Sequence, residues 1–99
     1  MKTRDEVLSA LSSRRTELED RFGVVAIALF GSVGRGDASD ASDLDLLVDF
    51  NRPVTLFDLA ALEEYLSESL GFERVDVVLR NSILPALRES ILRDAIDVR

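Results

Sequence analysis

Two apolar runs of strand length flank a turn rich in glycine and aspartate in the first half of the chain. The run VVAIALF, residues 24–30, is rich in β-branched residues and predicts a strand buried on both faces. The run DLDLLVDF, residues 43–50, begins by alternating acidic with apolar side chains. Because successive side chains of a strand point to opposite faces, the second run predicts one acidic face and one apolar face that packs under helices. The turn GSVGRGDASDAS, residues 31–42, connects the two predicted strands.

Three helices and a third strand are predicted around these runs. The opening TRDE has the form of a capping box, and Gly23 and Gly71 are suitable helix stops. The predicted helices cover residues 3–22, 55–70 and a segment from near Ser82, with Pro85 in its first turn; the third strand covers RVDVVLR, residues 74–80. This order predicts an α/β (α+β) fold: one domain over residues 1–99, with a small mixed β-sheet and helices packed on one face.

Helical spacing also predicts which side chains of the later helices face the core. The side chains predicted to face inward are Leu59, Leu62, Leu66, Leu70, Leu84, Leu87, Ile91 and Ala95. Those predicted to face outward are Glu63, Glu64 and Glu68.

Missing residue types narrow the chemistry that this chain can perform. It has no cysteine and no histidine, which excludes disulfides, thiol nucleophiles, Ser-His-Asp triads and zinc sites built on His or Cys. Its only lysine is Lys2, so no Walker-type loop ending in Gly-Lys is present. Carboxylates, hydroxyls, backbone amides, arginine and a bound metal ion remain as the groups available for catalysis.

Charge and hydropathy set expectations for partners and location. A net charge of −7 argues against a broad surface that binds nucleic acid directly. No apolar run approaches the ~20 residues of a membrane helix, and the charged start of the chain lacks the apolar core of a signal peptide. We therefore expect a cytoplasmic protein without a membrane partner.

Asp43 and Asp45 are the first candidate site residues. Two positions apart on one strand, they share a face with Cα atoms about 6.5 Å apart. Asp76 interrupts the third apolar strand and completes a three-carboxylate site if that strand neighbours the second. Such hard oxygen ligands favour Mg²⁺, as two ions, or Mn²⁺. An equally open alternative is that Asp43 and Asp45 face water on a half-exposed sheet. Three other aspartates are assigned to solvent: Asp37, Asp40 and Asp49.

The glycine turn is a candidate anion site. Gly31 allows close approach of the backbone to a ligand, and a helical turn beginning near Ser32 would direct free amide groups at an anion. Arg35 adds a positive charge. A plain turn is the simpler alternative for Gly-Ser alone, but here a pair of carboxylates follows about a dozen residues later.

The segment GSVGRGDASDASDLDLLV, residues 31–48, resembles the signature of the polymerase-β-like nucleotidyltransferase superfamily, and most closely its minimal, MNT-type branch. The later VDVVLR and LPALRESILRDAI segments are similar to the strand with that family's third acid and to its ending. The resemblance spans residues 24–96, with Gly34 where alanine is more usual.

The resemblance implies a role for each matching residue. Gly31 and Ser32, with Arg35 nearby, would hold the triphosphate of ATP. Asp43 and Asp45 would bind both metal ions, and Asp76 would bind the catalytic ion and help to activate the attacking hydroxyl.

The MNT-type branch is associated with toxin–antitoxin pairs. There the nucleotidyltransferase silences a small helical HEPN-domain ribonuclease toxin by transferring AMP from ATP to a tyrosine. The resemblance thus implies a catalytic antitoxin whose partner supplies the acceptor. Two alternatives remain open: an antitoxin that blocks its partner by binding alone, and a nucleotidyltransferase that acts on small molecules.

Overall fold

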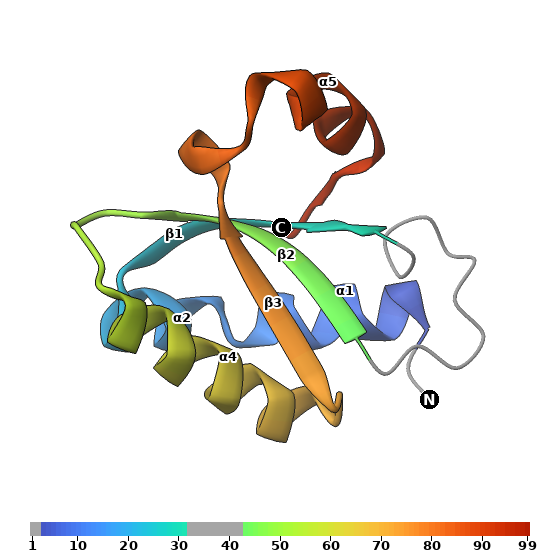
Figure 1. Ribbon diagram of the computed structural model, residues 1–99. Coiled ribbons are helices and arrows are strands. Elements are labelled where there is room, and N and C mark those ends of the chain that lie inside the picture. Colours follow the sequence, from blue (N-terminus) through green and yellow to red (C-terminus); the bar gives the residue numbers. More distant parts are fainter. Residues whose placement is uncertain (1–2, 32–42) are drawn as a thin grey trace.

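Four strands form one mixed sheet in the computed structural model, which describes residues 3–31 and 43–99 (Figure 1). The strands, in chain order, are β1 (Val24–Phe30), β2 (Asp43–Phe50), β3 (Arg74–Leu79) and β4 (Ile96–Asp97), and their order across the sheet is β3-β2-β1-β4. β1 pairs antiparallel with β2 and with β4, whereas β2 pairs parallel with β3. The predicted α+β class and mixed sheet are confirmed.

Helices cover both faces of this sheet, although most lie on one of them. The helical elements are α1 (Arg4–Ser13), α2 (Arg15–Phe22), α4 (Leu56–Leu70), the short 3₁₀ helix η1 (Arg80–Ser82) and α5 (Pro85–Asp94). Figure 1 shows α1, α2 and α4 together beneath the sheet, whereas α5 lies on the opposite face. Within the described residues, none of the helices is long and apolar enough to span a membrane.

Two hydrophobic clusters reflect the two faces of the sheet. Leu44, Leu46 and Val48 of β2 are buried in the larger cluster, against α1, α2 and α4. Leu47, the apolar residue of the other face of β2, belongs to a smaller cluster under α5, which includes Ala28 and Ile83. The predicted division of β2 into two faces is therefore confirmed, and the larger cluster supplies most of the apolar burial that stabilises the fold.

The caps of the first helical segment match the prediction, but its continuity does not. The Thr3 hydroxyl accepts a hydrogen bond from the backbone N–H of Glu6, and the backbone N–H of Thr3 donates the reciprocal bond to the Glu6 carboxylate, which completes a capping box. Gly23 ends α2 with φ at 75°. The single helix predicted over residues 3–22 is wrong: the chain breaks at Arg14, whose φ and ψ are −105° and 6°. The break allows α1 and α2 to bury their apolar residues separately, including Leu18 of α2.

The last helix also differs from its prediction. It begins at Pro85 rather than near Ser82, because proline disfavours helical backbone at the residue before it, and Leu84 is extended with ψ at 135°. Leu84 and Leu87 were predicted to face the core, but they are 66% and 51% exposed. Ile91 does pack on the smaller cluster, as predicted.

Tyr65 links α4 to α2 through Glu17. Its hydroxyl donates a hydrogen bond to a Glu17 carboxylate oxygen at 2.6 Å, and Arg21 lies over the Tyr65 ring with 4.9 Å to the centroid. The Tyr65 hydrogen bond, and then that from Arg21 at 3.1 Å, holds the pKa of Glu17 below its usual value. A carboxyl whose pKa is lowered by folding stabilises the fold above its unfolded pKa, and this contribution is lost as the pH falls through the folded pKa.

We expect Tyr65→Phe to raise the pKa of Glu17 and to lower the melting temperature at neutral pH, because it removes the hydrogen bond to the charged carboxylate. The deficit should shrink in acid, where Glu17 is protonated in both proteins. Thermal melts over a pH series, paired with an NMR titration of Glu17, measure both effects. Equal melting temperatures of the two proteins at every pH would show that Tyr65 acts through ring packing alone, because phenylalanine keeps the ring and lacks only the hydroxyl.

Candidate active site

The three predicted acids lie on one face of the sheet. β2 and β3 run parallel with Asp45 directly opposite Asp76 and with Asp43 opposite Arg74. Paired residues of neighbouring strands point to the same face, and so do residues two apart on one strand. This common face is the one opposite α1, α2 and α4, because the intervening Leu44 is buried among those helices. The register thus supplies the neighbouring third strand that the three-acid prediction required.

The acids differ in exposure. Asp43 is exposed, whereas Asp45 and Asp76 are half-buried. Among residues 3–31 and 43–99, no three acidic side chains are grouped closely enough to hold an ion as they stand. Convergence on one ion therefore requires rotation of side chains, for which the exposed Asp43 has the most freedom.

Gly31, the first residue of the predicted phosphate turn, lies directly beside Asp45. It follows Phe30, the residue of β1 that pairs with Asp45, and its φ is 75°. A Cβ atom on Gly31 would lie well inside contact distance of Oδ2 of Asp45 and 3.1 Å from its Cγ. Only glycine combines this backbone conformation with such an approach to a carboxylate. Ser32 and Arg35, the other predicted phosphate-binding residues, lie outside the described residues.

This arrangement fits a divalent ion. The donors are hard carboxylate oxygens, the ligand type that Mg²⁺ prefers, and they come from two neighbouring strands. The missing side chain at Gly31 leaves room for the Asp45 carboxylate itself, whose Oδ2 a Cβ atom would overlap.

Asp49 is not a purely solvated residue, and that prediction is wrong. Oδ2 of Asp49 lies 3.1 Å from Nε of Arg80, and a second nitrogen of Arg80 lies 3.6 Å from Asp97 of β4. The close Nε contact is an ion pair by distance without the alignment of a hydrogen bond. The period-2 pattern could have placed Arg80 on the acidic face, because Arg80 follows Val78 by two residues, but the pairing with Asp49 also depends on the strand register. Asp37 and Asp40 lie outside the described residues.

Glu63 and Arg74 are two residues near the site whose positions sequence reasoning missed. Glu63 was predicted to face outward, but its Oε2 accepts a hydrogen bond of 2.9 Å from the backbone N–H of Val77. β3 is an edge strand, so this contact satisfies a donor that has no partner strand, at the residue next to Asp76. Arg74 shares the face of the acids, and its spacing of two residues from Asp76 was the available signal.

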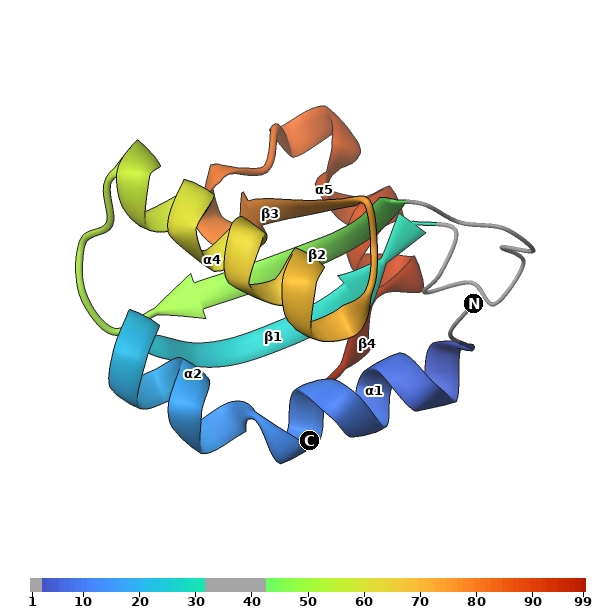
Figure 2. The same ribbon diagram turned by 90° about the horizontal axis from the view of Figure 1, so that it is seen from below.

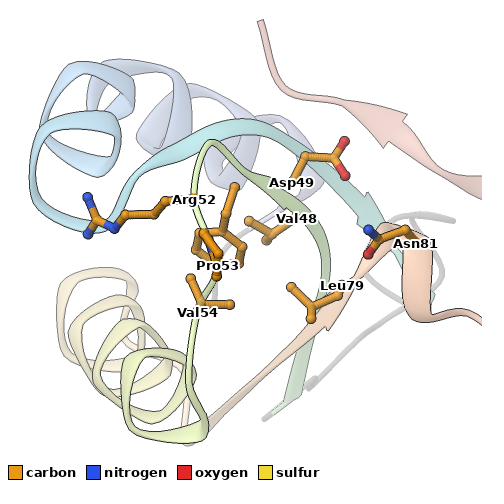
Figure 3. Close-up of a pocket in the computed structure, with 8 residues that line it drawn as sticks. Val48, Asp49, Arg52, Pro53, Val54, Leu79 and Asn81 are labelled. Atoms are coloured by element: carbon orange, nitrogen blue, oxygen red, sulfur yellow. The ribbon is translucent and has the colours of Figure 1, made fainter.

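A separate pocket lies at the other ends of β2 and β3 (Figure 3). Its volume is about 240 Å³, and it is lined by Val48, Asp49, Phe50, Arg52, Pro53, Val54, Leu79 and Asn81. Figure 3 shows Val48, Val54 and Leu79 around this space, with the charged ends of Arg52 and Asp49 directed away from it. The pocket is smaller than the ~300–1,000 Å³ typical of ligand sites and contains none of the three predicted acids.

Comparison with known proteins identifies the family to which this arrangement belongs. The family described as "Nucleotidyltransferase domain" matches residues 11–98. The chain is 42% identical over 98 residues to protein adenylyltransferase MntA of Thermococcus cleftensis, covering 99% of this chain and 98% of that protein.

Solved structures show the same fold. One, assigned to a minimal nucleotidyltransferase, has a TM-score of 0.75 and 43% identity and covers 96% of this chain and 95% of its own. Another, described as a tri-AMPylated Shewanella oneidensis HEPN toxin in complex with an MNT antitoxin, has a TM-score of 0.64 at 18% identity, covering 93% of this chain and 71% of the other, and supports the fold alone. The chain therefore belongs to the nucleotidyltransferase domain family and is a minimal nucleotidyltransferase.

Proposed function

We propose that this protein is a Mg²⁺-dependent adenylyltransferase that moves AMP from ATP to a tyrosine hydroxyl of a HEPN-domain toxin, and that it acts as the antitoxin of that toxin. The observation that carries the proposal is the placement of Asp45 opposite Asp76, directly beside Gly31. It brings Gly31, the first residue of the predicted phosphate turn, and a carboxylate pair together at one end of the sheet. The 42% identity to a protein adenylyltransferase supports the same reaction.

The proposed reaction is an in-line displacement. The acceptor oxygen forms a bond to the α-phosphorus of ATP, and the bond from that phosphorus to the α–β bridging oxygen breaks. Pyrophosphate leaves with the bridging oxygen, and the hydroxyl proton passes to a base, for which the Asp76 carboxylate is the candidate. Asp43, Asp45 and Asp76 would hold the divalent ions, whose bound charge offsets that of the phosphates and eases deprotonation of the acceptor.

The protein's own contribution is position and fixed charge. The β2–β3 register holds the carboxylates of Asp45 and Asp76 on one face. The backbone of Gly31 lies against the Asp45 carboxylate, so donor phosphates bound beside Gly31 would share one site with the carboxylates.

The proposed partner is a HEPN-domain toxin because structures of this fold include MNT antitoxins bound to such toxins. Tyr65, the single tyrosine of this chain, lies on α4, on the face of the sheet opposite the acids, and its hydroxyl is bonded to Glu17. The acceptor hydroxyl is therefore expected to come from another molecule.

We expect a trace of this protein, incubated with ATP and Mg²⁺, to modify a large excess of its HEPN-domain toxin partner. Each acceptor tyrosine should gain the mass of AMP, because a catalyst turns over and a blocker does not. Intact-mass and peptide mass spectrometry at a ratio of about one to one hundred measure the product. Parallel reactions with the α,β-methylene analogue of ATP, which cannot release pyrophosphate, provide the control. Inhibition of an unmodified partner only at equal amounts would mean that the protein works by binding alone.

A further inference from the structure

Arg74 is the described cation closest in the sheet to the three acids. It begins β3, stands directly opposite Asp43 and shares the face of Asp76 two residues later. Neighbouring strands lie about 4.8 Å apart, so the long arginine side chain can reach the space above any of the three carboxylates. Arg74 is exposed, which leaves its guanidinium accessible to a ligand.

Arg74 differs from several other arginines of the chain because it forms no ion pair with a described residue. Arg80 pairs with Asp49, Arg21 pairs with Glu17, and Arg93 pairs with Glu89. Arg74 has no ion pair or hydrogen bond to any residue in the described part of the chain, although the three acids stand on its own face. Its guanidinium is therefore not committed to holding the fold together.

The negative charge of the proposed site exceeds what two metal ions can offset, and Arg74 can offset part of the remainder. Three carboxylates and a triphosphate bring about seven negative charges to one place, and two divalent ions offset only about four of them. The guanidinium is always protonated and can contact two phosphate oxygens at once.

The position of Arg74 in the sheet indicates which phosphate of the nucleotide it would contact. Gly31 lies at the end of β1, on one side of β2, and Arg74 lies on β3, on the other side (Figure 2). A triphosphate whose outer phosphates lie beside Gly31 would present its α-phosphate above the acids, toward β3. We propose that Arg74 binds the transferred α-phosphate from the side opposite Gly31. This inference rests on the proposed function, because it assigns a further residue to the same site.

Binding measurements with two probes test the role of Arg74. Isothermal titration with the α,β-methylene analogue of ATP in Mg²⁺ should show affinity about 10- to 100-fold weaker for Arg74→Gln than for wild type, since a charge-assisted contact is lost. Pyrophosphate, which lacks the transferred phosphate, should bind both proteins equally. Arg74→Lys should recover part of the loss, because it keeps the charge but not the two-pronged geometry.

Arg4→Gln is the matched control. Arg4 is exposed and begins α1, on the other face of the sheet, so the same change of charge there should leave both affinities unchanged. Melting temperatures should be the same for all the variants. Equal analogue affinity in wild type and Arg74→Gln, or an equal loss for pyrophosphate, would overturn the role of Arg74 and leave the proposed function standing. Failure of the wild type to bind the analogue would overturn both.

Discussion

Asp45→Asn is expected to abolish AMP transfer and to leave the fold intact. Asp45 is the central acid of the site, since it pairs with Asp76 across the sheet, shares its face with Asp43 and lies against Gly31. The amide removes one negative charge and one strong metal-ligating oxygen while keeping the shape. Loss of one preorganised electrostatic group typically costs about 10²–10³ in rate, and we expect at least that loss in transfer measured by mass spectrometry. Asp43→Asn should behave in the same way.

The response to Mg²⁺ separates a metal site from a merely charged surface. An ion that binds only the folded protein raises its stability by mass action, so wild type should melt at a higher temperature with Mg²⁺ than without it. Asp45→Asn should gain much less. Without the ion it should melt no lower than wild type, because removal of one charge relieves repulsion among the carboxylates.

Asp49→Asn is the matched control for this substitution. Asp49 lies on the same face of the same strand, but it pairs with Arg80 and is separated from Asp45 by Leu47. It should retain transfer and the full gain from Mg²⁺. Equal gains in wild type and Asp45→Asn would count against a carboxylate metal site.

The faces of the strands were predictable from residue spacing alone. Leu44, Leu46 and Val48 had to share a face with one another and not with Asp45, and they form part of the larger core cluster. The spacing also predicted that Asp76 and Val75 lie on opposite faces of the sheet. It could not give the register, which depends on how β3 packs beside β2 over α4, and only the register places Asp76 opposite Asp45.

Elements with weak local signals escaped prediction. β4 is only two residues long and is defined by its pairing with Ala28 and Leu29 of β1, which lie far from it in the sequence. The break at Arg14 and the exposure of Leu84 reflect how each segment meets the sheet, which a regular apolar spacing does not encode. The ion pair between Asp49 and Arg80 likewise joins residues 31 positions apart, and only the parallel β2–β3 pairing brings them together.

Gly31→Ala is expected to damage both stability and AMP transfer. The backbone of Gly31 has φ at 75°, a conformation that costs an L-residue about 1–2 kcal/mol. The added methyl would also overlap Oδ2 of Asp45 and press on its Cγ, 3.1 Å away. The carboxylate therefore has to move, and a shift of about 1 Å in a catalytic group can cost on the order of 10²-fold in rate. Thermal melts and mass-spectrometric transfer assays measure the two losses.

Gly71→Ala separates these two losses, because Gly71 shares the strained backbone without the contact. Its φ is 79°, and a Cβ atom there would meet nothing within 4 Å. Both alanine variants should therefore lose stability through backbone strain, with a further loss in Gly31→Ala from the overlap with Asp45, whereas transfer below the melting temperature should fall only in Gly31→Ala. Full transfer by Gly31→Ala would mean that Asp45 can move without consequence, and the contact between the glycine turn and the carboxylate would then have no part in catalysis. Equal loss of transfer in both variants would trace the defect to stability alone, since strain is all that they share.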